Sequence, residues 1–269
     1  MLLYYQNLAD TATLSASTAD PNWPVANLQN PQRVRTWKTL GTQTQEWVVF
    51  DLGSAQAITD CILHFNNFDG TETGVQIQGN ATNSWGSPSF TANLPFAGFQ
   101  SLGSIIWNGG ANFNAYTAGV TFASQTFRYW RVVFTKANAT DIRWIGRVYL
   151  GTHYDTTNQG DPDYDGLDVS FEDLSIINKN LHGHLFSEQR NRYHLFNCQS
   201  TFVPDAIQSV FRVIYSANGI WFPWFIQIRT TAPYNNWYYV TFKKNLPEKV
   251  DGYDGGFYWA TALQLEENV

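Results

Sequence analysis

Short runs in which apolar and polar residues alternate fill much of the first half of the chain. The clearest runs are residues 46–52, 57–65, 73–78, 127–135 and 142–150. Clusters of Gly, Asn, Asp and Ser separate them, as in the NNFDG segment at residues 66–70. Alternation with a period of two is the pattern of a half-buried strand, and frequent turn residues keep such strands short. The first half therefore predicts a β-sandwich or barrel.

The second half predicts further strands and one helix. The predicted strands are residues 167–174, 192–202, 220–228, 237–243 and 258–265. Between two of them, Ile207, Val210, Phe211 and Ile214 recur at the spacing of one apolar helical stripe. The Gly219 that follows suits the left-handed conformation in which helices often end. We therefore expect a helix at about residues 205–217.

The composition changes after Leu150. Residues 151–173 contain seven acidic residues and no Lys or Arg, which is typical of a solvated linker. The fold class that we expect is mostly β, with an N-terminal β-sandwich and a C-terminal α+β sandwich that contains the helix. The predicted parts are a first domain at 1–152, an acidic linker at 153–166 and a second domain at 167–269.

Few charges distinguish this sequence from an average globular protein. Charged residues make up 14% of the chain, and the formal net charge is −6. A nucleic-acid-binding protein would carry a basic stripe. Arg33, Arg35 and Lys38 form the only dense basic cluster, and such a cluster is typical of a solvated face. We therefore expect no nucleic-acid partner.

Aromatic residues make up 16% of the chain and are frequent in the second domain. Tyr and Trp anchor protein interfaces, where Lys and Glu are depleted. We expect some of these aromatic side chains to contact other subunits. The alternative is that all of them are buried in one aromatic core. The interface candidates are Trp221, Trp224, Trp237, Tyr239 and Tyr258.

Cysteine usage and hydropathy indicate the cellular compartment in which the chain folds. Cys61 and Cys198 are the only cysteines, so we expect buried free thiols and folding in a reducing cytoplasm. Residues 1–5 (MLLYY) are too short and polar for a signal peptide. The most apolar window, residues 220–228, has the length of a strand, so we expect no membrane insertion.

Several motifs of the first half follow one another in a characteristic order. They are VANL at 25–28, RTW at 35–37, EWVVFDLG at 46–53, YWRV at 129–132 and GRVYLG at 146–151. In this order they resemble the discoidin-like, galactose-binding-type jelly rolls, over about residues 20–152. Arg147 stands where many members of that family have Glu, and the family's terminal cysteine pair is absent.

The resemblance implies a jelly-roll sandwich that binds carbohydrate through its inter-strand loops. Sugar rings stack on exposed aromatic rings, while amides bond the hydroxyls. An alternative for each tryptophan is packing beneath its own loop. The loop residues that the resemblance suggests are Asn66, Asn67, Trp85, Trp107, Asn108 and Tyr116.

A second set of motifs lies in the second half. It consists of FEDL at 171–174, FSEQRNR at 186–192, WFPWF at 221–225 and a tryptophan strand that runs into paired acids at 259–267. These segments resemble the small sandwich of phage distal-tail and tail-tip proteins. The resemblance implies a structural subunit of a tail tip or baseplate, located in the virion and made in the host cytoplasm. Its partners would be copies of itself, other tail proteins and a host-surface glycan.

The alternative function is a stand-alone carbohydrate-binding or adhesion protein. We expect no enzymatic activity, because the sequence has no G-x-S-x-G element and no glycine-rich phosphate loop followed by a helix. His182 and His184 could face one side of a strand as metal ligands, but Gly183 between them favours a turn.

One acidic segment fits the pattern of a calcium loop. Asp161, Asp163, Asp165 and Glu172 follow the spacing D-x-D-x-D-G-x5-E, in which short carboxylates converge on one hard cation. Neither flank shows the helical stripe of an EF-hand, so the alternative is an acidic linker that leads into a strand. Calcium is therefore the one cofactor that the sequence suggests.

Overall fold

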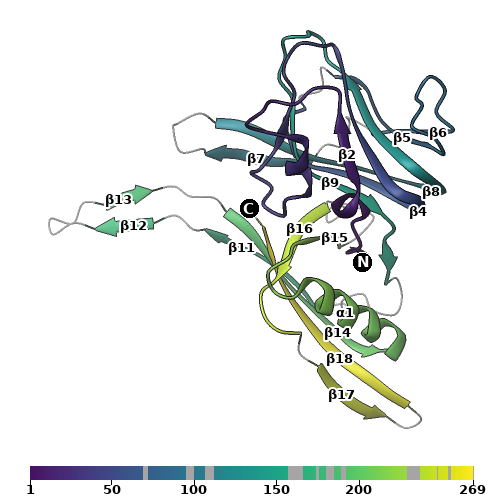
Figure 1. Ribbon diagram of the computed structural model, residues 1–269. Helices are drawn as coiled ribbons and strands as arrows, with labels where there is room; N and C mark the ends of the chain where they lie inside the picture. The colour runs from purple at the N-terminus through teal and green to yellow at the C-terminus, as the bar shows by residue number, and fades with distance from the viewer. Residues whose placement is uncertain are drawn as a thin grey trace. The chain divides into compact units, whose positions relative to one another are not determined.

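The computed structural model confirms the predicted fold class. The protein is mostly β, with two large antiparallel sheets and, within the described residues, one α-helix, which lies in the C-terminal part (Figure 1). The structure describes residues 1–68, 72–94, 100–106, 112–156, 166–173, 176–179, 185–188, 192–228, 237–246, 248–253 and 256–268. Along these segments, no helix is long and apolar enough to cross a membrane.

The chain divides into two compact units. Residues 6–107 and 111–153 form one of them, which we call the sandwich unit, and residues 1–5 and 154–269 belong to the other, the helical unit. The sequence pattern grouped residues 1–152 together. The first strand nevertheless pairs within the helical unit, and its three residues are too few to show any periodicity.

The strands of the sandwich unit are β2 (Thr13–Ala16), β3 (Trp37–Lys38), β4 (Gln45–Asn66), β5 (Thr73–Asn80), β6 (Phe90–Asn93), β7 (Gln100–Ile106), β8 (Asn112–Thr135) and β9 (Trp144–Gly151). Two short 3-10 helices, η1 (Leu8–Thr11) and η2 (Val25–Gln29), precede β3. The sheet order is β3-β9-β4-β8-β5-β6, with β2 added to β4 and β7 added to β8.

The long strands β4 and β8 pair with each other and bend around the core. Residues 48–51 of β4 pair with β2, whereas residues 60–66 pair with β9. The register shifts between Asp51 and Gln56, next to Gly53 at φ 75°. Apolar residues from both parts of β4 therefore enclose one core. Its fully buried members include Leu28, Trp37, Val48, Phe50, Ile58, Leu63, Trp130, Val132, Phe134 and Val148.

The helical unit is built on the second large sheet, in the order β10-β1-β15-β16-β18-β14-β11, with β17 on β18. Its strands are β1 (Leu2–Tyr4), β10 (Tyr154–Asp155), β11 (Leu167–Asp173), β14 (Arg192–Val203), β15 (Trp224–Gln227), β16 (Trp237–Phe242), β17 (Glu248–Tyr253) and β18 (Gly256–Glu267). A separate hairpin pairs β12 (Ile176–Lys179) with β13 (Leu185–Glu188).

The helix α1 (Asp205–Asn218) covers an apolar face of this sheet. Ile207, Phe211 and Ile214 are buried with residues of β14, β16 and β18. The helix ends at Gly219, whose φ of 56° favours glycine. The predicted helix at 205–217 thus ends within one residue of the observed one.

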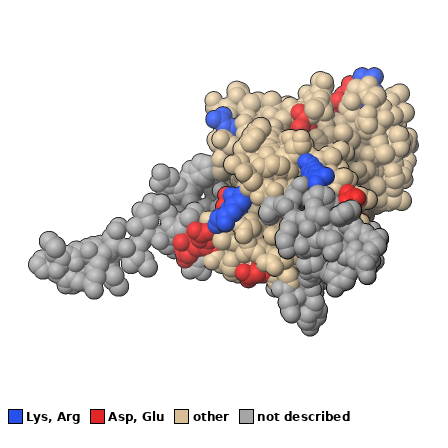
Figure 2. Space-filling view, turned by 90° about the horizontal axis from the view of Figure 1, so that it is seen from below, with Lys and Arg blue, Asp and Glu red and all other residues tan. Residues whose placement is uncertain are grey.

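Charged side chains are sparse, and several in the sandwich unit are buried in pairs. On the face seen in Figure 2, single Lys and Arg residues are scattered among Asp and Glu. Glu46 of β4 and Lys136 just after β8 are both fully buried, with Lys136 Nζ 3.3 Å from Glu46 Oε1. Lys136 also donates to the carbonyl oxygens of Ala139 and Asp141, and the Thr18 hydroxyl donates to Glu46. The carboxylate and the ammonium are therefore held by several hydrogen bonds.

The variant Glu46→Ala leaves a buried ammonium without its carboxylate. We expect it to lower the free energy of unfolding by about 3–5 kcal/mol, measured from urea unfolding of the full chain. Asp51→Ala is the matched control, because Asp51 also lies on β4 and pairs with the partly exposed Arg128. Its effect should be much smaller. Equal losses of stability in the two variants would show that burial of the Glu46–Lys136 pair does not matter.

Both thiols should be unreactive in the folded protein. Burial, with a smaller contribution from Asp60, raises the pKa of Cys61 far above its ordinary value, and burial raises the pKa of Cys198 to about 12. Since the thiolate is the reactive form, we expect a thiol reagent such as Ellman's reagent to label neither cysteine at pH 8 without denaturant. Both should react once the chain is unfolded in concentrated urea, and rapid labelling of the native protein would contradict their burial.

Candidate functional site

Two of the three asparagines that the sequence suggested as ligand residues, Asn66 and Asn67, form hydrogen bonds with the backbone. Asn66 is fully buried, and its Nδ2 donates to the carbonyl oxygens of Leu63 and Tyr116 at 3.3 and 2.9 Å. Asn67 Nδ2 donates to the Ile142 carbonyl at 3.1 Å, and its Oδ1 accepts from the Trp144 amide at 2.8 Å. Their amides therefore stabilise the end of β4.

The other suggested residues are dispersed. Tyr116 is half-buried on β8, directly opposite Asn66. Trp107 and Asn108 lie outside the described residues. Trp85 is half-buried in the loop between β5 and β6, where its Nε1 donates to Asn83 Oδ1 at 2.8 Å. Trp85 lies next to two further polar side chains, those of Asn83 and Arg131.

Trp85 covers Arg131, which belongs to β8. The guanidinium carbon lies 4.6 Å from the centroid of the indole ring, a cation–π contact. Asn80, at the end of β5, shapes the loop that carries Trp85: its Nδ2 donates to the Ser84 carbonyl and its Oδ1 accepts from the Ser89 hydroxyl. The ring is therefore held in place from two sides.

Arg131 belongs to one surface, formed by the side chains of β4, β8, β5 and β6 that point away from the core. Neighbouring residues of a strand point to opposite faces. Since Trp130, Val132 and Ile77 are in the core, Arg131 and Gln78 must face outward. We call this surface the outer face. Its members include Trp47, Val49, Asp51, Gln76, Gln78, Asn80, Asn93, Tyr129, Arg131 and Val133.

A hydrogen-bonded row of side chains crosses the outer face from β8 to β6. Arg131 Nε and Nη2 donate to Gln78 Oε1 at 3.0 and 2.5 Å. Gln78 Nε2 donates to Gln76 Oε1, and Gln76 Nε2 donates to Asn93 Oδ1, both at 3.0 Å. Gln78 is only 7% exposed, whereas Asn93 is open to solvent. We call these four residues the amide row.

Aromatic rings and one ion pair border the amide row. Trp47 and Tyr129 are half-buried on the same face. Arg128 binds both carboxylate oxygens of Asp51, at 2.7 and 2.8 Å, and lies over the Tyr129 ring. Hydrogen bonds from Arg128 hold the pKa of Asp51 below its ordinary value. The outer face thus combines flat apolar rings with fixed amide and guanidinium groups, a surface suited to a ligand with apolar faces and polar edges.

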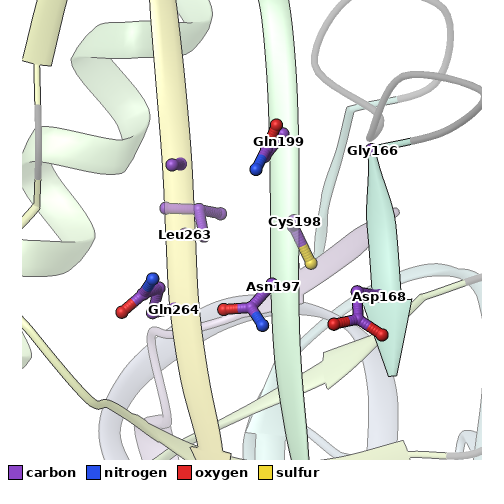
Figure 3. Close-up of a pocket in the computed structure, with 8 residues that line it drawn as sticks. Gly166, Asp168, Asn197, Cys198, Gln199, Leu263 and Gln264 are labelled. Atoms are coloured by element: carbon purple, nitrogen blue, oxygen red, sulfur yellow. The ribbon is translucent and has the colours of Figure 1, made fainter. Parts of the chain in front are cut away.

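A pocket lies on the sheet of the helical unit. It has a volume of about 250 Å³, and residues of β11, β14 and β18 line it (Figure 3). Asp168, Asn197 and Gln264 stand directly opposite one another on the three strands and contribute its polar lining together with Gln199. The pocket also contacts Cys198, whose raised pKa makes it a poor nucleophile. The described residues that line it include no aromatic side chain.

The suggested calcium ligands are not brought together in the described part of the chain. Asp161, Asp163 and Asp165 lie outside it. Glu172 is partly exposed on β11, 3.5 Å from Lys243 Nζ, and a hydrogen bond from Tyr193 lowers its pKa. Within the described segments, no group of three or more His, Cys, Asp or Glu side chains is placed to hold a metal ion.

The five suggested interface aromatics have different surroundings. Trp221 is 72% exposed just after α1, whereas Trp224 and Tyr239 are 3% and 1% exposed. Trp224 lies beside Phe242 beneath the helix, and the Tyr239 ring packs against that of Phe225 at an interplanar angle of 36°. Trp237 is half-buried. The Tyr258 side chain is outside the described side chains, although its backbone belongs to β18.

Sequence reasoning missed most of the outer face. Arg131, Gln76, Gln78 and Asn93 were not among the suggested residues. A signal was nevertheless present, because amides occupy alternate positions of the segment TGVQIQGN, at residues 76, 78 and 80. That spacing places all three on one side of a strand.

No family model matches the sequence, and no curated protein matches it. Solved structures are similar to about half of the chain. Chitosan-binding module 1 of a chitosanase/glucanase from Paenibacillus sp. IK-5 covers 55% of this chain over 99% of its own length, at 16% identity and a TM-score of 0.40. A fucose-binding module of Streptococcus pneumoniae covers 56% over 99%, at 13% identity and a TM-score of 0.39.

A larger enzyme is also similar over a part of its length. The chain matches 28% of a GH29 fucosidase from Ruminococcus gnavus, at 10% identity and a TM-score of 0.40, and the match covers 57% of this chain. None of these findings bears on the tail-protein resemblance of residues 167–269. The structures to which the chain is similar thus include a chitosan-binding and a fucose-binding module.

Proposed function

We propose that the sandwich unit binds carbohydrate on its outer face. One observation carries the proposal: Trp85 is fixed beside the amide row, so that an aromatic ring and oriented amides occur on one face of the sheet, which is open to solvent at Asn93. The two modules named above bind chitosan and fucose, which are also carbohydrates. The proposal nevertheless rests on the geometry of this face.

The chemistry of sugars fits such a surface. The apolar face of a sugar ring packs on an aromatic ring, and its hydroxyl groups accept from and donate to side-chain amides. Because the amides of Gln76 and Gln78 are already held by neighbours, they lose little conformational freedom when a ligand binds. Pre-ordering of these side chains therefore lowers the entropy cost of binding a ligand.

A structural role in a phage tail is a second candidate, and it concerns the helical unit. Trp221 and Ile220 are 72% and 53% exposed, and Val213 on the outside of α1 is 49% exposed. Contiguous exposed apolar side chains are typical of a protein contact, and Ile220 and Trp221 are consecutive residues. The two functions are compatible, because they use different units.

The carbohydrate proposal predicts that Trp85→Ala loses glycan binding. We expect the Kd of the full chain for its best ligand on a glycan array, measured by calorimetry, to rise at least about tenfold. Trp23→Ala is the matched control, because Trp23 is also half-buried and lies under a cation, Lys38, at 3.7 Å. The proposal fails if no glycan binds, or if both variants bind as the wild type does.

The assembly candidate predicts that the full chain self-associates through the Trp221 region. In sedimentation velocity, we expect Trp221→Ser to reduce the fraction of oligomer at a given concentration. Val34→Ser is the control, because Val34 is 42% exposed in the sandwich unit. A chain that stays monomeric at high concentration and binds no tail protein would contradict this role.

A further inference from the structure

Arg131 has no anionic partner among the described residues, in contrast to four other cations of the sandwich unit. The paired cations are Arg128 with Asp51, Lys136 with Glu46, Arg143 with Glu72 and Arg147 with Asp10. Arg131 contacts the Trp85 ring and the neutral amide of Gln78, and no carboxylate of the described residues lies within ion-pair distance of it. Burial lowers the pKa of Arg131, and no neighbouring charge of the described segments offsets this effect.

The surroundings of Arg131 strengthen any ion pair that it forms. Its register partner on β4 is Val49, which is 2% exposed, and Val133 two positions along β8 is 4% exposed. Apolar neighbours lower the local dielectric, so a charge held there interacts strongly with an opposite charge. Asp51, on the same face, is already paired with Arg128 and is not available to Arg131.

Arg131 also fixes the orientation of the whole amide row. A guanidinium has only donors, so Gln78 must present its oxygen to Arg131. Its nitrogen then faces Gln76, whose nitrogen faces Asn93 in turn. Each amide oxygen in the row is therefore already an acceptor, and free donors remain at both ends: Nη1 of Arg131 and Nδ2 of Asn93 make no hydrogen bond to a described residue.

We propose that the outer face selects acidic saccharides, with a carboxylate or sulfate of the ligand bound at the free edge of the Arg131 guanidinium and a sugar ring against Trp85. This inference rests on the proposed carbohydrate function and names its ligand class. An end-on contact with Nη1 and Nη2 suits an anion with two oxygens in one plane.

A neutral sugar is disfavoured at the same place. It would remove water from the guanidinium without supplying an anion, and an unpaired charge that loses its water is strongly destabilised. The row crosses two strand spacings, about 10 Å, so a ligand longer than one ring can reach both Arg131 and Asn93. The face therefore discriminates through an interaction gained with acidic ligands and a desolvation penalty incurred with neutral ones.

The test compares matched ligands on the full chain by isothermal titration calorimetry. The ligands are a galacturonic acid trisaccharide, the same trisaccharide with its carboxyl groups reduced to alcohols, and a sulfated galactose trisaccharide. We expect an acidic ligand to bind at least about tenfold more tightly than the neutral one, and this preference to shrink as NaCl is raised. Comparison of the Kd values of the galacturonic acid and the sulfated trisaccharide shows whether a carboxylate or a sulfate binds more tightly.

Arg131→Gln should abolish the preference for acidic over neutral ligands and leave the part of the binding that depends on Trp85. Arg35→Gln, which removes one exposed charge from the same unit, should leave the preference unchanged, and thermal unfolding verifies that both variants fold. Equal binding of acidic and neutral ligands, or an unchanged preference in Arg131→Gln, overturns this inference while Trp85-dependent binding keeps the proposed function. Absence of binding to all three ligands and to the glycan array overturns both.

Discussion

Pairing between β4 and β8 is the interaction on which the sandwich unit depends. The two strands stay hydrogen-bonded along most of their length, and every other strand described in the unit adds to one of them directly or through a neighbour. Because the strands bend near Gly53, one continuous pair of strands encloses the core. The same pairing fixes Arg131 beside Gln78, because β5 joins β8 on the edge that β4 leaves open.

Local patterns predicted many elements of the fold but not how they join. The runs at 46–52 and 57–65 are the two parts of β4, so the turn residues between them mark a bulge and not the end of a strand. Pro223 shortens the predicted strand 220–228 to Trp224–Gln227. The helix was recognised because its apolar stripe repeats over several turns, whereas β1 has only three residues and no repeat.

The site was harder to predict, because its residues come from different strands. Trp85 was suggested as a ring in a loop, and the structure places it over a strand residue far away in sequence. The asparagines at the end of β4 satisfy backbone groups, a role that composition does not separate from ligand binding. Arg131 shows no special sequence pattern. That no described carboxylate pairs with it is visible only when the cross-strand neighbours are known.

The position of β1 between β10 and β15 makes the sandwich unit an insertion within the helical unit. Tyr4 and Gln227, 223 residues apart, are hydrogen-bonded neighbours, so the sheet cannot close until nearly the whole polypeptide has been synthesised. A single cut between the halves would leave Leu2 and Leu3 without their sheet and would remove the strand that joins β10 to β15, next to the edge of that sheet. Excision of the inserted unit therefore requires two cuts, one after residue 5 and one after residue 153.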